Sequence, residues 1–197
     1  MNLPNKITLS RIILTIVAMV LFLCVFPYSY LISALVFVIA SLTDFFDGYL
    51  ARKLKQITTI GKLLDPIADK VLVICMLLLV IDKDVIPTPY GIIAATIVIS
   101  REFVIGAFRQ IAASSNLILA ADKLGKFKTL LQYLSVPLLI ISVKEANPIF
   151  NLPTCYTAVA IFSLSVLMTV VSAINYIVQN KVILKQNESS KDNTIIK

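Results

Sequence analysis

Four carboxylates lie close together in a chain that is otherwise strongly apolar, and they carry the clearest chemical signal. They belong to the pattern D-x2-D-G-x2-A-R-x8-G-x3-D-x3-D, whose fixed positions are Asp44, Asp47, Gly48, Ala51, Arg52, Gly61, Asp65 and Asp69. An ionisable group at membrane depth is energetically unfavourable, so it indicates a functional site. Four acids at helical spacing indicate a divalent cation, and all-oxygen ligation favours Mg²⁺, Mn²⁺ or Ca²⁺ over zinc.

Helical geometry would bring these acids together. Asp44 and Asp47 are related as i and i+3, so both project from one face of a helix. Asp65 and Asp69 are related as i and i+4 and share a face in the same way. The short connection makes the two helices antiparallel neighbours, and two ions roughly 3.5–4 Å apart could then clamp a phosphoryl displacement. The alternative is a metal-free acid cluster paired with Arg52, Lys62 and Lys70.

The small residues of the pattern fit a ligand site beside the acids. Gly48 and Ala51 lie one and two turns after Asp44, where small side chains leave room for a ligand to approach the backbone. Close packing between membrane helices is the alternative reason for small residues there. Arg52 follows at the membrane edge, either as a basic anchor or as a contact for a pyrophosphate.

Composition sets the class of protein. The chain has 197 residues, of which 58% are hydrophobic and 15% are charged, and its mean hydropathy is +0.92. Soluble domains carry about a quarter charged residues, so we predict an all-α integral membrane protein. The sequence has no histidine, which excludes imidazole ligands and histidine-based acid–base catalysis. The three cysteines lie in apolar runs without zinc or disulfide spacing.

The hydropathy pattern predicts about six transmembrane helices. They cover residues 7–26, 30–53, 61–81, 90–113, 123–143 and 156–179. Prolines fall in the predicted connections, where they are tolerated, at positions Pro27, Pro87, Pro89, Pro148 and Pro153. Residues 1–184 are expected to form one membrane domain, and the polar tail 185–197 is expected to be a disordered cytoplasmic segment.

Basic residues predict the orientation. Most of them lie on the side that would hold both termini, whereas the opposite loops hold Lys83 and Lys144. The positive-inside rule then places both termini in the cytoplasm. The net charge of +7 follows from this topology and from anionic lipid, so nucleic-acid binding is not expected. We predict a multi-pass protein of the inner (plasma) membrane.

Span length locates the acids within this topology. The apolar run 71–81 is too short to cross a core of ~30 Å at ~1.5 Å per residue, so the third span must include Asp65 and Asp69. The run 31–43 is short as well, so the second span must include Asp44 and is expected to include Asp47. The site therefore lies in the cytoplasmic half of the bilayer or at its edge, and it faces the cytoplasm.

The acid pattern resembles that of a known family. The residues from Asp44 to Asp69 are similar to the signature of the CDP-alcohol phosphatidyltransferases at all eight fixed positions. The resemblance implies a six-helix membrane enzyme, commonly a homodimer. Such an enzyme transfers a phosphatidyl or similar group from a CDP-linked donor to an alcohol and releases CMP.

The resemblance also implies roles for individual residues. Asp44, Asp47 and Asp65 would bind the metal ions, which are Mg²⁺ or Mn²⁺ and number two. Asp69 would serve both as a metal ligand and as the catalytic general base. The residues implied to bind the CDP-diacylglycerol donor are Gly48, Ala51, Arg52 and Thr58.

Other stretches resemble the bacterial phosphatidylglycerophosphate synthases within that family, which use sn-glycerol 3-phosphate. They are residues 2–11, 65–70, 101–103 with Arg109, and 125–129. Asn5 and Thr8 in the first stretch are candidate contacts for the nucleotide of CDP-diacylglycerol, although capping of the first helix explains them equally well.

Charge gives independent support for a phosphorylated acceptor. Arg101 lies near the middle of its span, where a charge is unfavourable unless it is paired or functional. Arg109, Lys126 and Lys128 lie nearer the cytoplasmic face, where anchoring at the membrane surface is the alternative. Together, basic groups on neighbouring helices could hold a dianionic phosphate. The candidate residues for binding glycerol 3-phosphate are Arg101, Arg109 and Lys126.

Two other functions remain open. The same chemistry could use another acceptor, namely phosphatidylglycerol to give cardiolipin, inositol phosphate, or serine. A cation transporter would also place acids inside the membrane, often with inverted repeats and a site at the bilayer centre. Here the acids cluster toward one face and no internal repeat is evident, which favours the enzyme.

Overall fold

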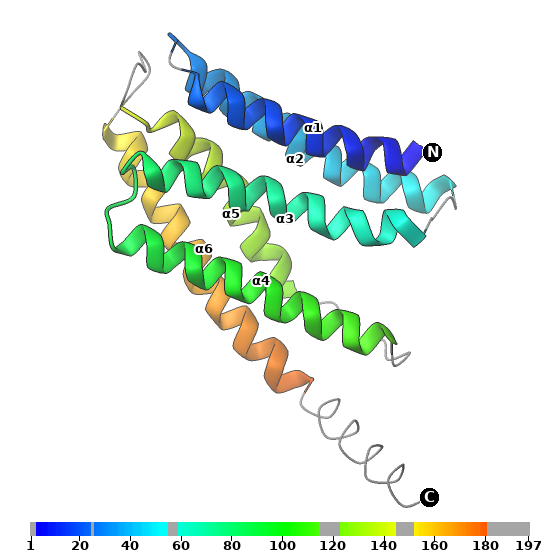
Figure 1. The fold of residues 1–197 in the computed structure, drawn as a ribbon. Coiled ribbons are helices and arrows are strands. Elements are labelled where there is room, and N and C mark those ends of the chain that lie inside the picture. The colour runs from blue at the N-terminus through cyan, green and yellow to red at the C-terminus, as the bar shows by residue number, and fades with distance from the viewer. Residues whose placement is uncertain (1–2, 25, 55–58, 115–122, 145–151, 181–197) are drawn as a thin grey trace, which may run out of the picture.

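Long helices dominate the described chain, as the sequence predicts. The structure is a computed structural model that describes residues 3–24, 26–54, 59–114, 123–144 and 152–180. Inside the helices, the description leaves out the side chains of 3–7, 44–54, 59–66, 69, 111, 113–114 and 123. The helices are α1 (Leu3–Leu23), α2 (Ser29–Leu54), α3 (Thr59–Asp82), α4 (Tyr90–Ser114), α5 (Lys123–Ile141) and α6 (Leu152–Gln179) (Figure 1).

Prolines mark the largest differences from the predicted boundaries. Helix α6 begins at Leu152, so Pro153 lies in its first turn and not in the preceding connection, where the prediction was wrong. Helix α1 begins at Leu3 and likewise takes Pro4 into its first turn. Proline suits this place because the first N–H groups of a helix have no partner within the helix. Helix α5 also carries Pro137 in its interior.

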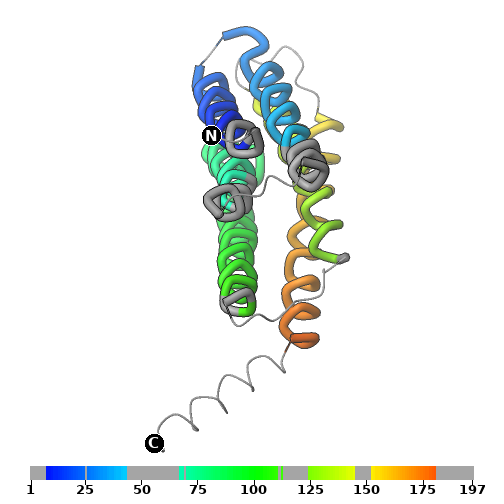
Figure 2. Tube along the Cα trace, turned by 90° about the vertical axis from the view of Figure 1, so that its right-hand side faces the viewer, coloured from blue at the N-terminus to red at the C-terminus, as the bar shows by residue number. Residues whose placement is uncertain are grey.

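The helices form two layers. In Figure 2, α1, α3 and α4 follow one another in one layer, and α2, α5 and α6 follow one another in the second. Across the layers, α1 packs on α2, α3 packs on α5, and α4 packs on α6. Consecutive helices alternate in direction, so the end of α2, the start of α3 and the end of α4 lie toward the same end of the bundle as the start of α1 (Figure 1).

The distribution of side chains is that of a protein in lipid. Large apolar side chains lie on the outside, including Phe103 at 69% exposure and Leu167 at 60%. Several polar side chains lie inside, and Arg11 is fully buried. In a membrane, an apolar side chain is no more stable inside the protein than against lipid. Buried polar groups, in contrast, join helices by hydrogen bonds. Ser33 on α2 does so, since its Oγ donates to the carbonyl oxygen of Ala18 on α1 at 2.8 Å.

The apolar helices agree with a multi-pass membrane protein. Within the described residues, three stretches are long and apolar enough to cross a membrane: Tyr90–Gln110, Leu124–Ile141 and Leu152–Gln179. Two shorter apolar stretches, Thr8–Leu23 and Ser29–Thr43, belong to α1 and α2. The predicted all-α membrane fold is confirmed. The orientation of the termini stays a prediction, and the tail 185–197 lies outside the described residues.

Candidate active site

The acidic motif lies on two neighbouring helices. Positions 44, 47, 48, 51 and 52 belong to the last three turns of α2, and positions 61, 65 and 69 belong to α3. The two helices pack against each other. The prediction that each acid pair lies within one helix is therefore confirmed. The side chains of these positions lie outside the described residues, as do Thr58 and the side chain of Asn5, so their metal-binding and donor-binding roles stay predictions.

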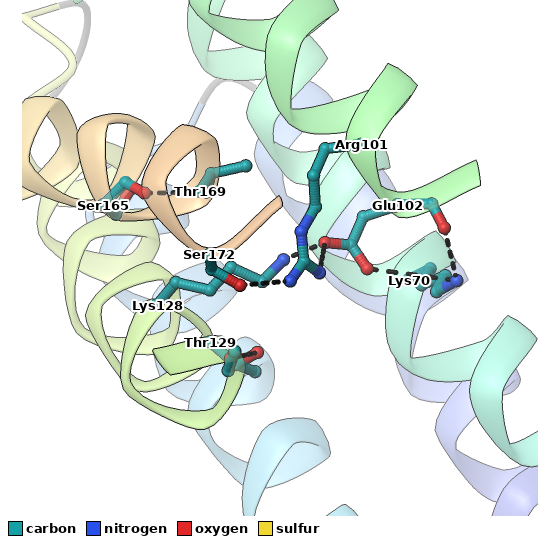
Figure 3. A network of polar contacts seen from close by, with 9 residues as sticks. Lys70, Arg101, Glu102, Lys128, Thr129, Ser165, Thr169 and Ser172 are labelled. Atoms are coloured by element: carbon teal, nitrogen blue, oxygen red, sulfur yellow. Dashed lines mark hydrogen bonds and ion pairs between the residues drawn. The ribbon is translucent and has the colours of Figure 1, made fainter. Parts of the chain in front are cut away.

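One turn of α4 holds the centre of a buried charge cluster. Glu102 Oε1 accepts from Arg101 Nη1 at 3.1 Å and also from Lys128 Nζ on α5. Lys70 Nζ on α3 donates to the backbone carbonyl oxygen of Glu102 at 2.9 Å and lies 3.9 Å from its Oε2. Figure 3 shows these side chains converging from three helices. We call Lys70, Arg101, Glu102 and Lys128 the Glu102 cluster.

The Glu102 cluster gathers three cationic side chains. Three cations surround one carboxylate, and the side chains of Lys128 and Arg101 are only 3% and 8% exposed. Charges that are withdrawn from water need partners, and Glu102 supplies one of them. A phosphate monoester, with two charges and several acceptor oxygens, is the kind of anion that such a group of cations can bind.

Helix α6 fixes the guanidinium of Arg101. Arg101 Nη2 donates to Ser172 Oγ at 2.6 Å. Ser172 continues a row of small polar side chains with Ser165 and Thr169, all of them buried. Figure 3 shows this row along the face of α6 that is turned toward Arg101. Small hydroxyl side chains let α4 and α6 approach closely and still offer an acceptor to the arginine.

A cavity of about 570 Å³ opens beside the Glu102 cluster, between α3 and α4. Its polar wall includes Lys70, Arg101, Glu102 and Arg109, and its apolar lining includes Ile67, Ile74, Phe103 and Ile105. Gly106 also lines it. A Cβ atom at this position would lie 2.9 Å from Lys70 Nζ, so the glycine leaves room for the ammonium group. The volume is that of a site for a small molecule.

The three predicted acceptor-binding residues differ in their surroundings. Arg101 is buried in the Glu102 cluster. Arg109 lines the cavity and lies over the ring of Tyr176 on α6, with Cζ 5.6 Å from the ring centroid, which is a cation–π distance. Lys126 is exposed at the start of α5. The structure brings Arg101 and Arg109 to one cavity, and all three assignments stay predictions.

Sequence reasoning did not select Lys70 or Ser172, and it did not choose Lys128 over Lys126. Residues at i and i+2 point to different sides of a helix, so only one of the two lysines could be buried. Of these residues, Lys70 could have been selected from the sequence, because it directly follows Asp69 on the motif helix. Ser172 gave no charge signal, since a serine in an apolar span is commonplace.

Helix α1 presents a polar stripe to the interior. Thr8, Arg11 and Thr15 are all buried on one face of the helix, and Thr15 Oγ1 donates to the carbonyl oxygen of Arg11 at 2.9 Å. Thr8, which is predicted to contact CDP-diacylglycerol, thus faces the protein interior and not lipid. Arg11 is buried as well.

Comparison with known proteins agrees with the motif. Residues 1–178 match the family model of the CDP-alcohol phosphatidyltransferases. A CDP-diacylglycerol–glycerol-3-phosphate 3-phosphatidyltransferase of Bacillus subtilis is 38% identical over 196 residues, covering 93% of this chain and 97% of the relative. Proteins with the same name from Rickettsia bellii and Salmonella choleraesuis are 38% and 34% identical, over 76% and 89% of this chain and 80% and 93% of their own. The chain belongs to the CDP-alcohol phosphatidyltransferase family.

Proposed function

We propose that this protein transfers the phosphatidyl group of CDP-diacylglycerol to sn-glycerol 3-phosphate. The products are phosphatidylglycerophosphate and CMP. The observation that carries the choice of acceptor is the Glu102 cluster, where cationic side chains of three helices converge beside a cavity of small-molecule size. A phosphorylated alcohol offers an anion to these cations, whereas serine carries no net charge. The names of the relatives support the same acceptor.

The acid motif is the proposed metal centre. Asp44, Asp47, Asp65 and Asp69 form an all-carboxylate donor set on two packed helices, which suits hard divalent ions such as Mg²⁺ or Mn²⁺. Two such ions, when bound, would neutralise the pyrophosphate and stabilise the charge of the departing CMP. Gly48, Ala51 and Arg52 on the same stretch of α2, with Thr8 on α1, would hold the donor.

The chemistry requires one proton transfer and one displacement. The carboxylate of Asp69 accepts the proton of the 1-hydroxyl group of glycerol 3-phosphate as general base. The hydroxyl oxygen forms a bond to the β-phosphorus of CDP-diacylglycerol, and the bond from that phosphorus to the bridging oxygen breaks. CMP leaves with the bonding electrons. Arg101 and Arg109 bind the acceptor phosphate, so the hydroxyl is presented in a fixed place.

The setting of the reaction follows from the substrates. CDP-diacylglycerol keeps its acyl chains in lipid, and glycerol 3-phosphate and CMP are water-soluble. The acids face the cytoplasm in this proposal. The distribution of the basic residues places them on that side of an inner (plasma) membrane. We also propose that the enzyme acts as a homodimer, as the resemblance to its family implies.

The test measures CMP release by the purified protein in lipid nanodiscs. The assay supplies CDP-diacylglycerol, Mg²⁺ or Mn²⁺, and one acceptor at a time. We expect release with glycerol 3-phosphate, loss of at least 100-fold on removal of the metal with EDTA, and the same loss in Asp65→Asn. Release only with phosphatidylglycerol, inositol phosphate or serine would overturn the acceptor. Metal-dependent cation flux in liposomes without CMP release would support a transporter instead.

A further inference from the structure

A second and much smaller space lies beside the Glu102 cluster. It measures about 20 Å³ and lies among α3, α4 and α5, with Lys70, Glu102, Lys128 and Gln132 in its lining. A void needs roughly 10–15 Å³ to hold a water-sized group. The space therefore admits one oxygen atom with its hydrogen and little more. We call it the Gln132 pocket.

The amide of Gln132 is the unusual part of this pocket. The residue is only 4% exposed, and among the described residues its Nε2 has no hydrogen-bond partner. The hydroxyl of Ser135, one turn further on, donates to the backbone oxygen of Gln132 and not to its side chain. Because a buried N–H group without an acceptor is unfavourable, the amide indicates a group that enters the pocket and accepts a hydrogen bond.

The carboxylate of Glu102 indicates which chemical group enters the pocket. Its Oε1 already accepts from Arg101 and Lys128, whereas Oε2 lies 3.9 Å from Lys70 Nζ, which is longer than a hydrogen bond. The pocket thus offers a hydrogen-bond donor at Gln132 and a hydrogen-bond acceptor at Glu102. A phosphate group is too large for a space of about 20 Å³. A hydroxyl group both accepts and donates, so it can satisfy Gln132 and Glu102 together.

Building on the proposed function, we propose that the Gln132 pocket binds the secondary hydroxyl group of glycerol 3-phosphate. Gln132 Nε2 donates to the hydroxyl oxygen, and Glu102 Oε2 accepts its hydrogen. The cations of the Glu102 cluster then hold the phosphate next to it, and the 1-hydroxyl group remains for attack. Gln132 is in this way a specificity-determining residue that distinguishes a hydroxylated acceptor from a deoxygenated one.

The experiment compares two acceptors that differ only in this hydroxyl group. Glycerol 3-phosphate and 3-hydroxypropyl phosphate both carry the attacking hydroxyl and the phosphate, but the second lacks the hydroxyl at the central carbon. In nanodiscs, we expect the wild type to prefer glycerol 3-phosphate by about 100-fold in kcat/KM, because a site built to bind a hydroxyl rejects an analogue without it. In Gln132→Leu the preference should fall to within about fivefold, mainly through lost activity on glycerol 3-phosphate.

Controls separate the possible failures. Gln179→Leu, at an exposed position near the end of α6, should keep the wild-type preference, and Gln132→Met replaces Gln132→Leu if the leucine variant fails to fold. An equal loss on both acceptors would mean that Gln132 holds only a structural water or the helix packing, and it would overturn the inference. An unchanged preference would overturn it too. A wild type that releases no CMP with glycerol 3-phosphate would instead overturn the proposed function, and the inference with it.

Discussion

Arg101 on α4 and Ser172 on α6 are joined by a hydrogen bond of 2.6 Å from Nη2 to Oγ. The opposite nitrogen, Nη1, lies 3.1 Å from Glu102 Oε1, so the guanidinium is held from two sides. An arginine that is fixed before the ligand arrives loses little rotamer freedom on binding. The two contacts therefore make Arg101 a preorganised anion-binding group inside the bundle, and they make Ser172 a positioning residue.

Replacing Ser172 should weaken acceptor binding without stopping the chemistry. In Ser172→Ala the guanidinium loses its hydrogen bond to α6, and a hydrogen bond to a charged group contributes roughly 1.5 kcal/mol. We expect the KM for glycerol 3-phosphate to rise about tenfold, while kcat and the KM for CDP-diacylglycerol change less than about twofold. Steady-state CMP release measures all three. Ser172→Thr, which keeps the hydroxyl, should restore most of the affinity.

The matched control for this change is Thr157→Ala, which removes a hydroxyl from an exposed position on the same helix. It should leave both KM values unaltered. If Ser172→Ala raised both KM values equally, or lowered only kcat, the hydroxyl would be acting on the bundle as a whole and not on Arg101.

Removing the carboxylate of Glu102 should destabilise the fold. In Glu102→Gln, the cations of Lys128 and Arg101 remain buried while their shared counter-charge is gone. Breaking a buried ion pair from one side destabilises by about 3 kcal/mol. We expect a lower Tm in detergent micelles, with a partial return when millimolar inorganic phosphate is added, because the dianion replaces the missing charge. Asp82→Asn, an exposed acid at the end of α3, is the control. A Tm equal to that of wild type would show that water already screens the cluster.

The class of the fold and the family were predictable because their signals are local. The apolar runs correspond to the six helices of the described residues, and the acid pattern has fixed spacing along two of them, so neither inference needed knowledge of distant contacts. The register of the helices against one another was not predictable. It decides that Lys70, Glu102 and Lys128, from three helices, meet at one place.

Residues without a local signal were missed for the same reason. Ser172 and Gln132 are neutral, and each becomes informative only through its neighbours in the bundle. Arg11 illustrates the opposite case, because its charge was visible in the sequence but its burial was not. A basic residue near the start of a span is usually explained by topology, and only packing shows that this one points inward.

The ring of Tyr176 should matter more than its hydroxyl group. Arg109 lies over the ring, and among the described residues the buried hydroxyl has no hydrogen-bond partner. Tyr176→Phe should therefore keep wild-type kinetics and stability within about 0.5 kcal/mol. Tyr176→Leu removes the cation–π contact, which contributes about 0.5–1 kcal/mol at an exposed arginine, so we expect the KM for glycerol 3-phosphate to rise about threefold. A loss in Tyr176→Phe as large as in Tyr176→Leu would instead assign the role to the hydroxyl.

Gly106 permits a test in which stability and acceptor binding change in opposite directions. Alanine in the interior of a helix is favoured over glycine by up to about 1 kcal/mol, so Gly106→Ala should raise the Tm or leave it unchanged. The new Cβ would stand 2.9 Å from Lys70 Nζ and displace the ammonium from the carbonyl oxygen of Glu102. We expect the KM for glycerol 3-phosphate to rise about fivefold as the Glu102 cluster loses one ordered cation.

The double variant identifies the cause of that rise. In Lys70→Met the displaced ammonium is already absent, so adding Gly106→Ala should change the KM by less than about twofold. The two changes would then be coupled, as expected for residues in direct contact. Additive effects on the KM would mean that the methyl group obstructs the cavity itself. The measurement therefore separates a role for Lys70 in holding the acceptor phosphate from a purely steric role for Gly106 in admitting it.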